Sequence, residues 1–367
     1  MQKPRKRSTT NRRRVLAGAV ELAAGAAALG LPWLAPAARA QSRTAQPPGA
    51  AAAPPPPPPP PAPLPAGTHL VLLGTQAGPG VSLTRGQTAS VVVVDSVPYL
   101  FDCGYGTVRQ LTASNIGVTR INSVFLSHLH NDHTSDLVAL FAHQFTGNKA
   151  TPTEVYGPPG TEGLVRAAGE FLRADVEIRT VDEGRTNRTD RLLHGHDVAA
   201  TATPTLVFRD ERLTVITAEN THFPERAKER MAHRSLAYRV ETKNRSIVFS
   251  GDTAYSKNLV DLARGADVFV CEVMAQSVYD RNMETAKTDA AAGRTDSVAR
   301  HVAETHSTPA DVGRMASEAK VKTVVLYHQI AGQRPLGSLD TSASIFVDGV
   351  HSQFAGEVIV GQDLMVL

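Results

Sequence analysis

Residues 128–133 read HLHNDH, so three histidines and an aspartate fall within six positions. They follow the apolar run 123–127 (SVFLS), which predicts a strand. In an extended segment residues i and i+2 point to the same side, so His128 and His130 can reach one metal ion. Asp132 and His133 follow in the turn, point elsewhere and suit a second ion. Neutral imidazole and carboxylate are ligands that Zn²⁺ accepts, and four of them in this arrangement favour a metal site over a solvated loop.

Two metal ions need more ligands than this loop supplies, and the best candidates directly follow other predicted strands. His222 stands in ITAENTHFP, Asp252 in IVFSGDT and His328 in VVLYHQI. Each of the three alone is a weak signal, because an isolated histidine is more often structural. Together with the loop they complete a set for two ions.

The other histidines are predicted to lie outside the site. His194 and His196 form an HGH triplet in a polar stretch without neighbouring ligands, and we expect them at the surface. His233 competes with His222 but lies in a charged, helix-like segment, which disfavours it. His143 and His301 fall on helical patterns and are expected to be packing or surface residues.

Composition limits the classes of protein that this chain can represent. The chain has 367 residues, 42% of them hydrophobic, which is enough for a large core. Its two cysteines, Cys103 and Cys271, exclude a disulfide framework and a cysteine-based zinc finger. Both lie in apolar, strand-like runs, so two buried thiols are expected, with one disulfide as the alternative.

The net charge of +3 is concentrated near the N-terminus. Residues 1–40 contain eight Lys or Arg and one acid, Glu21, which gives +7 and leaves 3 − 7 = −4 for the rest of the chain. An acidic remainder argues against nucleic acid as a partner.

The first 67 residues are predicted to precede the folded domain. Residues 1–40 combine a basic start, an apolar stretch and an Ala-x-Ala pattern at Ala38 and Ala40, as in secretory signals. The consecutive arginines Arg12–Arg14 resemble a bacterial twin-arginine signal, which predicts that the twin-arginine export machinery is a partner and that the protein is periplasmic or secreted. A retained membrane anchor is the alternative; after cleavage no membrane span remains. Residues 41–67 are a linker rich in Ala and Pro, expected to be polyproline II, and residues 68–367 form the domain.

From residue 68 onwards, short apolar runs alternate with helical patterns, which is typical of an α/β fold. Residues 69–75, 89–96 and 98–104 are predicted strands, and residues 106–117 and 134–145 are predicted helices. Residues 235–253 predict a hairpin that turns near Lys243. Two sheets packed face to face, with helices outside, are the expected architecture.

The His-x-His-x-Asp-His motif resembles that of the metallo-β-lactamase superfamily. The chain is more specifically similar to its ribonuclease Z and arylsulfatase-type branch, through motifs that occur in the same order over most of residues 68–367: LVLLGTQAGPG, FDCGYGTVRQL, HLHNDH, VYGPPGT, FSGDT, HSTPADVGRMASEAKVKTVVLYH and GEVIVGQDLMVL. The resemblance implies a four-layered αββα sandwich with the metals at one edge of the paired sheets.

The resemblance also assigns roles to single residues. It implies that His128, His130 and His222 hold the first ion, that Asp132, His133 and His328 hold the second, and that Asp252 bridges both. His306 matches the proposed proton donor of the branch, and Glu272 matches the acid that orients it; Asp132 joins them as an expected catalytic residue. Asp102 resembles a support for the metal loop, with capping of the next turn as an equal alternative. The expected cofactors are two Zn²⁺, although Mn and Fe accept the same ligands.

Such a set suits hydrolysis of a small ester, and we expect a phosphodiester or a sulfate ester. Precursor tRNA is disfavoured, because the basic arm with which ribonuclease Z grips tRNA is absent between LAYRV and FSGDT. A metallo-β-lactamase or lactonase activity, a ribonuclease Z-like phosphodiesterase and a zinc-binding protein without catalysis are the alternatives. A homodimer is compatible with the sequence.

Overall fold

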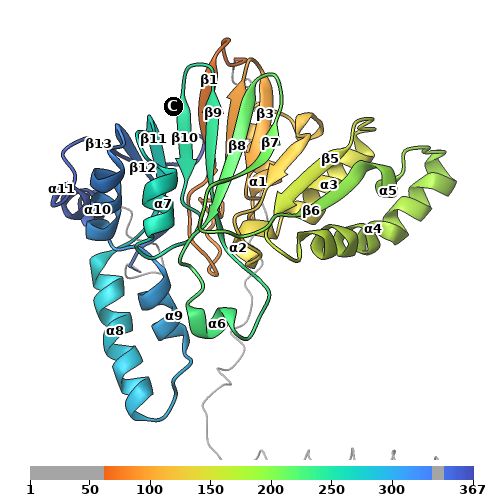
Figure 1. Ribbon diagram of the computed structural model, residues 1–367. Helices are drawn as coiled ribbons and strands as arrows, with labels where there is room; N and C mark the ends of the chain where they lie inside the picture. Colours follow the sequence, from red (N-terminus) through yellow and green to blue (C-terminus); the bar gives the residue numbers. More distant parts are fainter. Residues whose placement is uncertain (1–61, 333–342) are drawn as a thin grey trace, which may run out of the picture. The chain divides into compact units, whose positions relative to one another are not determined.

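Two β-sheets pack face to face, and each carries helices on its outer side (Figure 1). The computed structural model describes residues 62–332 and 343–367. Its four layers confirm the predicted αββα sandwich. The predicted export signal and most of the predicted linker fall on residues 1–61, outside the described residues.

The N-terminal sheet has six strands in the order β1-β2-β3-β4-β5-β6. The strands are β1 (Thr68–Gly74), β2 (Ala89–Val94), β3 (Val97–Phe101), β4 (Ser123–Phe125), β5 (Thr153–Gly157) and β6 (Leu193–Asp197). Strand β2 runs antiparallel to β1 and to β3, whereas β3, β4, β5 and β6 run parallel to one another. The carboxyl ends of β3 to β6 therefore share one edge of this sheet.

The C-terminal sheet has seven strands in the order β13-β12-β11-β10-β9-β8-β7. The strands are β7 (Thr205–Arg209), β8 (Leu213–Glu219), β9 (Leu236–Thr242), β10 (Ser246–Phe249), β11 (Val268–Met274), β12 (Thr323–Ile330) and β13 (Glu357–Val360). Strands β10 to β13 are parallel, and β8 runs in their direction because it is two antiparallel steps from β10. The carboxyl ends of β8, β10, β11 and β12 consequently lie at a common edge.

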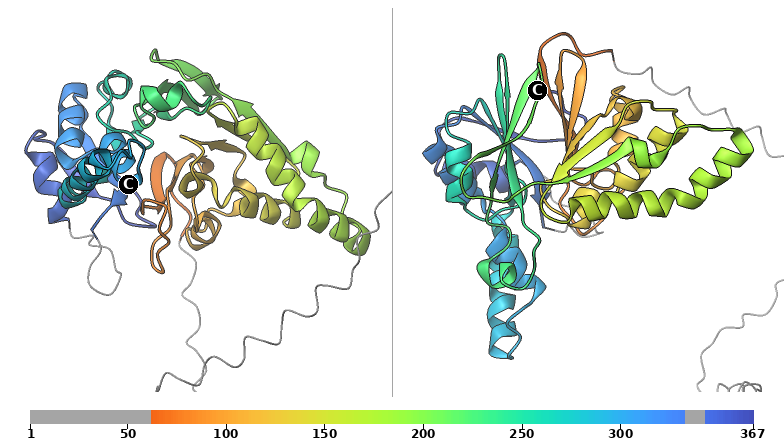
Figure 2. Two further views of the ribbon diagram at one scale, coloured as in Figure 1. Left: turned by 90° about the horizontal axis from the view of Figure 1, so that it is seen from below. Right: turned by 45° about the vertical axis from the view of Figure 1, so that its right-hand side comes forward.

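Helices cover the outer faces of both sheets (Figure 2). The helices are α1 (Thr107–Ala113), the 3₁₀ helix η1 (Val118–Arg120), α2 (Asn131–Thr134), α3 (Leu137–Thr146), α4 (Thr161–Glu183), α5 (Thr189–Leu192), α6 (Glu225–Lys228), α7 (Lys257–Leu262), α8 (Gln276–Ala291), α9 (Val298–Thr305), α10 (Pro309–Ala319) and α11 (Ser344–His351). On the N-terminal sheet, α1, α3 and α4 pack through Leu111, Leu140 and Val165 respectively. On the C-terminal sheet, α7, α10 and α11 pack through Leu259, Met315 and Phe346. Helices α8 and α9 lie side by side and extend beyond the sheets (Figure 1).

The core between the sheets is aromatic near the carboxyl end of β4. Phe101 stacks on Phe125 and on Phe249 of the other sheet, with ring centroids 4.9 and 4.5 Å apart. The Tyr238 hydroxyl donates a 2.8 Å hydrogen bond to the Leu126 carbonyl, so β9 is tied to the segment that leads into the HLHNDH loop. This packing fixes where the loop leaves the core.

The structure confirms some of the predictions about single segments and adds elements that were not predicted. The hairpin is confirmed as β9 and β10, joined by residues 243–245, and both cysteines are free and buried as expected. The HGH stretch forms strand β6 and pairs with β5. Helix α8 has no counterpart among the predicted elements. Within the described residues, no helix has both the length and the apolar character that crossing a bilayer requires.

Candidate metal centre

The HLHNDH loop presents its ligand-type side chains in two directions, as its spacing predicts. His128 and His130 precede α2, and His128 Nε2 lies 2.9 Å from His130 Nδ1. Asp132 and His133 lie in the single turn of α2, where the backbone changes direction. His128, Asp132 and His133 are buried, whereas His130 and Asn131 are not, so three of the four ligand-type side chains lie in the protein interior.

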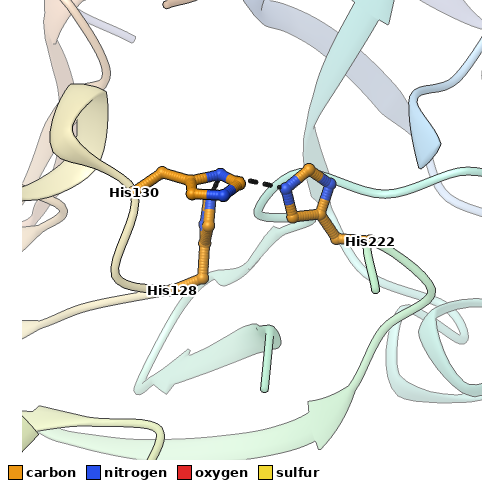
Figure 3. Close-up of side chains that lie close together, drawn as sticks. All are labelled: His128, His130 and His222. Carbon is orange, nitrogen blue, oxygen red and sulfur yellow. Dashed lines mark hydrogen bonds between the residues drawn. The ribbon is translucent and has the colours of Figure 1, made fainter. Parts of the chain in front are cut away.

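His222 completes a group of three imidazoles with His128 and His130 (Figure 3). Its Nε2 lies 3.2 Å from His130 Nδ1. It is placed by Asn220, whose side chain accepts from the His222 N–H and donates to the Ser250 carbonyl, and which thereby ties the end of β8 to the end of β10. His222 Nδ1 faces the Thr305 carbonyl at 3.3 Å. One ring nitrogen of His222 is thus held by the backbone while the other faces the group.

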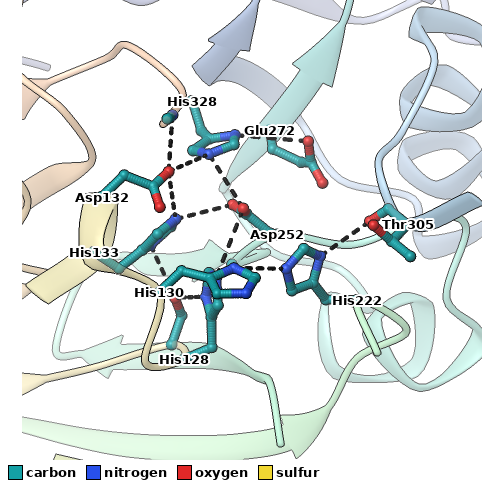
Figure 4. Close-up of polar contacts among 12 residues, drawn as sticks. His128, His130, Asp132, His133, His222, Asp252, Glu272, Thr305 and His328 are labelled. Carbon is teal, nitrogen blue, oxygen red and sulfur yellow. Dashed lines mark hydrogen bonds and ion pairs between the residues drawn. The ribbon is translucent and has the colours of Figure 1, made fainter. Parts of the chain in front are cut away.

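A second group combines Asp132, His133, Asp252 and His328 (Figure 4). Asp252 Oδ1 lies 3.2 Å from His133 Nε2, and its Oδ2 lies 3.2 Å from His328 Nε2. The same Oδ2 lies 3.8 Å from His128 Nε2, which belongs to the first group. Asp252 therefore stands between the two groups, where a bridging ligand has to be.

Close backbone approaches hold the two aspartates in place. The Gly78 N–H donates a 2.8 Å hydrogen bond to Asp132 Oδ2, and a Cβ at Gly78 would lie 2.4 Å from that oxygen. Gly251 precedes Asp252 with a φ of +60°, in the left-handed region that glycine adopts readily. His328 also has a positive φ, 39°, which is a strained conformation for a residue with a side chain and is typical of functional sites.

Asp102 contacts Ser127, just before the HLHNDH loop, and His133 within it. These contacts distinguish between the two roles predicted for Asp102. Its Oδ1 accepts from the Ser127 N–H at 2.7 Å, and its Oδ2 accepts from the Ser127 hydroxyl and contacts His133 Nδ1, both at 2.9 Å. The carboxylate thereby orients the His133 ring so that Nε2 faces Asp252. Asp102 supports the loop, as the resemblance implies.

Glu272 and His306 form a buried pair beside the second group. His306 Nδ1 lies 2.9 Å from Glu272 Oε2, and the Glu272 carboxylate also accepts from the Thr253 N–H. Burial acts to lower the pKa of His306, but the neighbouring Glu272 carboxylate raises it above its usual value overall. The pair thus favours an imidazolium that keeps Nε2 for another partner.

The two groups fit metal ions by the chemistry of their donors. Burial lowers the pKa values of His128 and His222 well below the usual range, which favours neutral imidazoles, and the Nε2 atom of each faces His130 Nδ1. Burial also acts to lower the pKa of His328, yet the carboxylates of Asp252 and Asp132 raise it to about 10, which shows that positive charge is favoured there. The buried atoms His133 Nε2 and Asp252 Oδ1 face each other at 3.2 Å, and neither forms a hydrogen bond within the described part of the chain. A cation would satisfy all of these atoms.

All nine predicted site residues therefore converge on one edge of the sandwich. His233 is exposed and contacts the Pro159 carbonyl, which agrees with the choice of His222. His143 is exposed, as predicted. His301 was expected to be a packing or surface residue, but its ring centroid lies 5.1 Å from that of His222 and 5.7 Å from that of His306. It joins the site because α9 carries it there, and only its position five residues before His306 could have suggested this.

Comparison with known proteins places the chain in a family. Residues 98–329 match the model of the beta-lactamase superfamily domain, which is well over half of the chain, so the chain belongs to this superfamily. With its fold and its convergent histidines and aspartates, it is a metal-dependent hydrolase.

Individual relatives make the likeness more specific. The chain is 28% identical over 255 residues to ribonuclease Z of Brevibacillus brevis, a match that covers 63% of this chain and 74% of the relative. It is 25% identical over 298 residues to ribonuclease Z of Mycobacterium bovis, covering 80% and 96% of the two chains. Among solved structures, human short-form tRNase Z shares 25% identity with a TM-score of 0.54 and covers 82% of this chain and 98% of its own. A metallo-beta-lactamase fold protein of Bacillus subtilis, 16% identical with a TM-score of 0.55 and coverage of 82% and 98%, shares the fold.

Proposed function

We propose that this chain hydrolyses phosphodiester bonds with a dinuclear zinc centre and acts on small substrates outside the cytoplasm. The observation that carries the proposal is Asp252, which faces both groups of ligand-type side chains with the Glu272–His306 pair beside it. The ribonuclease Z relatives support the phosphodiester as the bond that is broken.

Each group would hold one ion. His128, His130 and His222 form one site, Asp132, His133 and His328 form the other, and Asp252 reaches both. When bound, two zinc ions supply a water of lowered pKa and positive charge that offsets the charge of the reacting phosphoryl group. Asp102 keeps a ligand histidine oriented, since its carboxylate contacts His133 Nδ1 at 2.9 Å on the side that points away from the site. Glu272 Oε2 lies 3.7 Å from His328 Nδ1, which is an ion-pair distance and not a hydrogen bond.

His306 would move a proton in this reaction. Its Nδ1 is occupied by Glu272, so its Nε2 can donate to the oxygen that leaves when the ester bond breaks. His301 of α9 stands beside both His306 and His222. The leaving group would therefore depart on the side of the site that α9 forms.

The short connection between β9 and β10 favours a small substrate. Three residues, 243–245, join these strands, and the chain beyond residue 40 carries a net charge of −4. Both features oppose a grip on the phosphates of a long RNA. Cleavage of precursor tRNA is the second candidate, which the names of the relatives favour.

A substrate panel separates these candidates. The zinc-loaded full chain is assayed on bis(4-nitrophenyl) phosphate, 4-nitrophenyl phosphate, 4-nitrophenyl sulfate, a lactone, a cephalosporin and a precursor tRNA, before and after chelation. We expect the highest kcat/KM on the phosphodiester and its loss on chelation. Preferred turnover of the sulfate, lactone or cephalosporin would contradict the bond assignment, and efficient cleavage of precursor tRNA would contradict the small substrate.

The location rests on residues 1–40 and has its own test. Replacing Arg12, Arg13 and Arg14 with Lys keeps the charge but removes the guanidinium pair, so the protein should stay in the cytoplasm. Unchanged delivery to the periplasm would show that the twin-arginine route is not used. Cell fractionation followed by immunoblotting measures the result.

A further inference from the structure

We propose that Glu154, His194 and His196 form a second metal site, which takes one divalent transition-metal ion of the class that imidazole binds, such as Zn²⁺, Ni²⁺ or Cu²⁺. The three residues lie on β5 and on the edge strand β6, elements that supply nothing to the metal centre described above. Within residues 62–332 and 343–367, no hydrogen bond or ion pair joins them to that centre.

Strand register brings the three side chains together. Glu154 pairs directly with His194 across the parallel β5–β6 ladder. His194 and His196 are two residues apart on one strand, so they project from the same face of the sheet. The His194 Nδ1 atom lies 2.9 Å from Glu154 Oε1, and His196 Nε2 lies 2.6 Å from Glu154 Oε2. One carboxylate thus already engages both imidazoles.

The donor set is one that proteins use for zinc. Two imidazoles and one glutamate, with a water in the fourth position, make a tetrahedral site. Each oxygen of the Glu154 carboxylate already lies within hydrogen-bond distance of one of the two rings.

Local packing gives the site both order and room. The Tyr156 ring stacks on His196 with centroids 4.7 Å apart and an interplanar angle of 16°, which holds that imidazole in position. The His194 and His196 side chains are 41% and 43% exposed. The donor atoms of Glu154, His194 and His196 do not all lie within 4.8 Å of one another in the described structure, so the exposed His194 ring has to turn toward an ion that Glu154 and the stacked His196 hold. An ion held in this way would join the edge strand β6 to β5 and stabilise the folded chain in proportion to its occupancy.

The expectation that the HGH triplet has no neighbouring ligand is wrong for a simple reason. Glu154 lies 40 residues before His194 in the sequence, and only the parallel pairing of β5 and β6 makes them neighbours. The triplet is at the surface as predicted, but it is not isolated.

Copper is the probe for this site, because sites with nitrogen and oxygen ligands bind Cu²⁺ more tightly than other first-row divalent ions. The full chain is titrated with Cu²⁺ as wild type, His196→Ala, Glu154→Gln and the control His69→Ala. His69 lies on β1, and its ring contacts the Pro65 carbonyl. Bound copper per chain is counted by dialysis, and its ligands are identified by electron paramagnetic resonance.

We expect His196→Ala to bind one Cu²⁺ fewer than wild type and to lose a signal from an ion with two imidazole nitrogens. Glu154→Gln, which keeps the shape of the side chain, should lower the affinity for that ion by at least about tenfold. This is the smallest loss seen when a partner of a metal site is removed. His69→Ala should match wild type. Because the site is counted as a difference between chains that share the main centre, the result does not depend on what that centre holds.

Equal copper stoichiometry in wild type and His196→Ala would overturn the proposal and leave a hydrogen-bonded surface cluster. A melting temperature that Cu²⁺ or Ni²⁺ raises equally in both chains would overturn it as well. A rise confined to wild type and His69→Ala would support an ion that ties β6 to its neighbour.

Discussion

The two sheets contribute to the metal centre in different ways. The N-terminal sheet supplies His128, His130, Asp132 and His133 from one loop, whereas the C-terminal sheet supplies His222, Asp252 and His328 one at a time, each associated with a different strand. The loop is held by local contacts to Asp102. The single residues are held by the order of the strands, because β8, β10 and β12 run in one direction.

This difference has a consequence for the effect of mutations. On the HLHNDH loop, one supporting residue, Asp102, contacts both Ser127 and His133. Replacing it should therefore disturb several neighbouring positions of the loop. On the C-terminal sheet, each ligand-type residue is positioned separately. The effect of replacing one therefore depends on how many of the two groups of ligand-type side chains it contacts. Asp252 reaches both groups, which makes it the most sensitive position of that sheet.

Asp252→Ala should produce the largest effect. It removes the only carboxylate that, among the described residues, faces His128, His133 and His328 together, so metal content should fall at both sites. The loss of metal affinity should exceed the 10–100-fold that removal of a supporting hydrogen-bond partner costs. Elemental analysis and kcat/KM measure it, and exposed His233→Ala is the control. An active variant that keeps two ions would break the comparison.

His306→Ala should produce the next largest effect, on turnover and not on metal content. In the proposed mechanism His306 supplies a proton from the C-terminal side, and loss of a general acid costs about 10²–10⁴-fold. Glu272→Gln should act in the same direction but more weakly, since the imidazole is then misoriented and not absent. The measurement is kcat on two phosphodiesters that differ only in leaving-group pKa.

The leaving-group comparison separates the roles of His306. The loss should shrink for nitrophenolate, which needs little protonation. An equal loss on both esters, or one that follows the missing metal, would identify His306 as a ligand or a packing residue.

Asp102→Ala tests the loop side of the comparison. It leaves the Ser127 N–H and the His133 ring without their partner, which should weaken metal binding at the second site about 10–100-fold. It should also destabilise the fold by about 1–3 kcal/mol, the cost of unsatisfied buried polar groups. Zinc titration and urea unfolding measure the two effects. Asp102→Asn keeps one acceptor oxygen and should recover part of both; no difference between the variants would contradict the supporting role.

Asp267→Asn should give the smallest effect and concerns only the C-terminal sheet. Asp267 precedes β11 and accepts from the Ser246 N–H and from Lys322. Burial acts to raise the pKa of Asp267, but hydrogen bonds from Lys322 and Ser246 lower it to about 2. Since the folded pKa lies below the unfolded one, the stabilisation is present above about pH 4 and is lost as the pH falls toward 2.

The magnitude of this effect is modest because the Asp267 side chain is 30% exposed and its charge is partly screened. We expect the free energy of unfolding of Asp267→Asn to be about 1–2 kcal/mol lower than that of wild type at neutral pH. The difference between wild type and variant in urea unfolding should shrink steeply as the pH falls from about 4 through 2, and the two chains should hold the same amount of metal at neutral pH. A difference that stays undiminished at pH 2 would assign the loss to packing.

Much of this arrangement could be predicted from the sequence because the signals are local. The alternation of apolar runs with helical patterns predicts the sandwich, and the spacing of HLHNDH predicts two directions for its side chains. His222, Asp252 and His328 were candidates because each stands at the end of an apolar run. Helix α8 was not predicted, since its mostly polar sequence buries only Val278 and gives no clear apolar stripe.

The sequence by itself determined which residue types could bind metal and on which elements they lie, because spacing along a strand or turn fixes the direction of a side chain. It could not determine which of the 13 histidines meet. Strand order decided that Asp252 faces both groups, that α9 carries His301 to the site, and that Glu154 meets His194 and His196. These contacts join residues that are far apart in the chain, and they exist only once two sheets and their helices have packed around a common core.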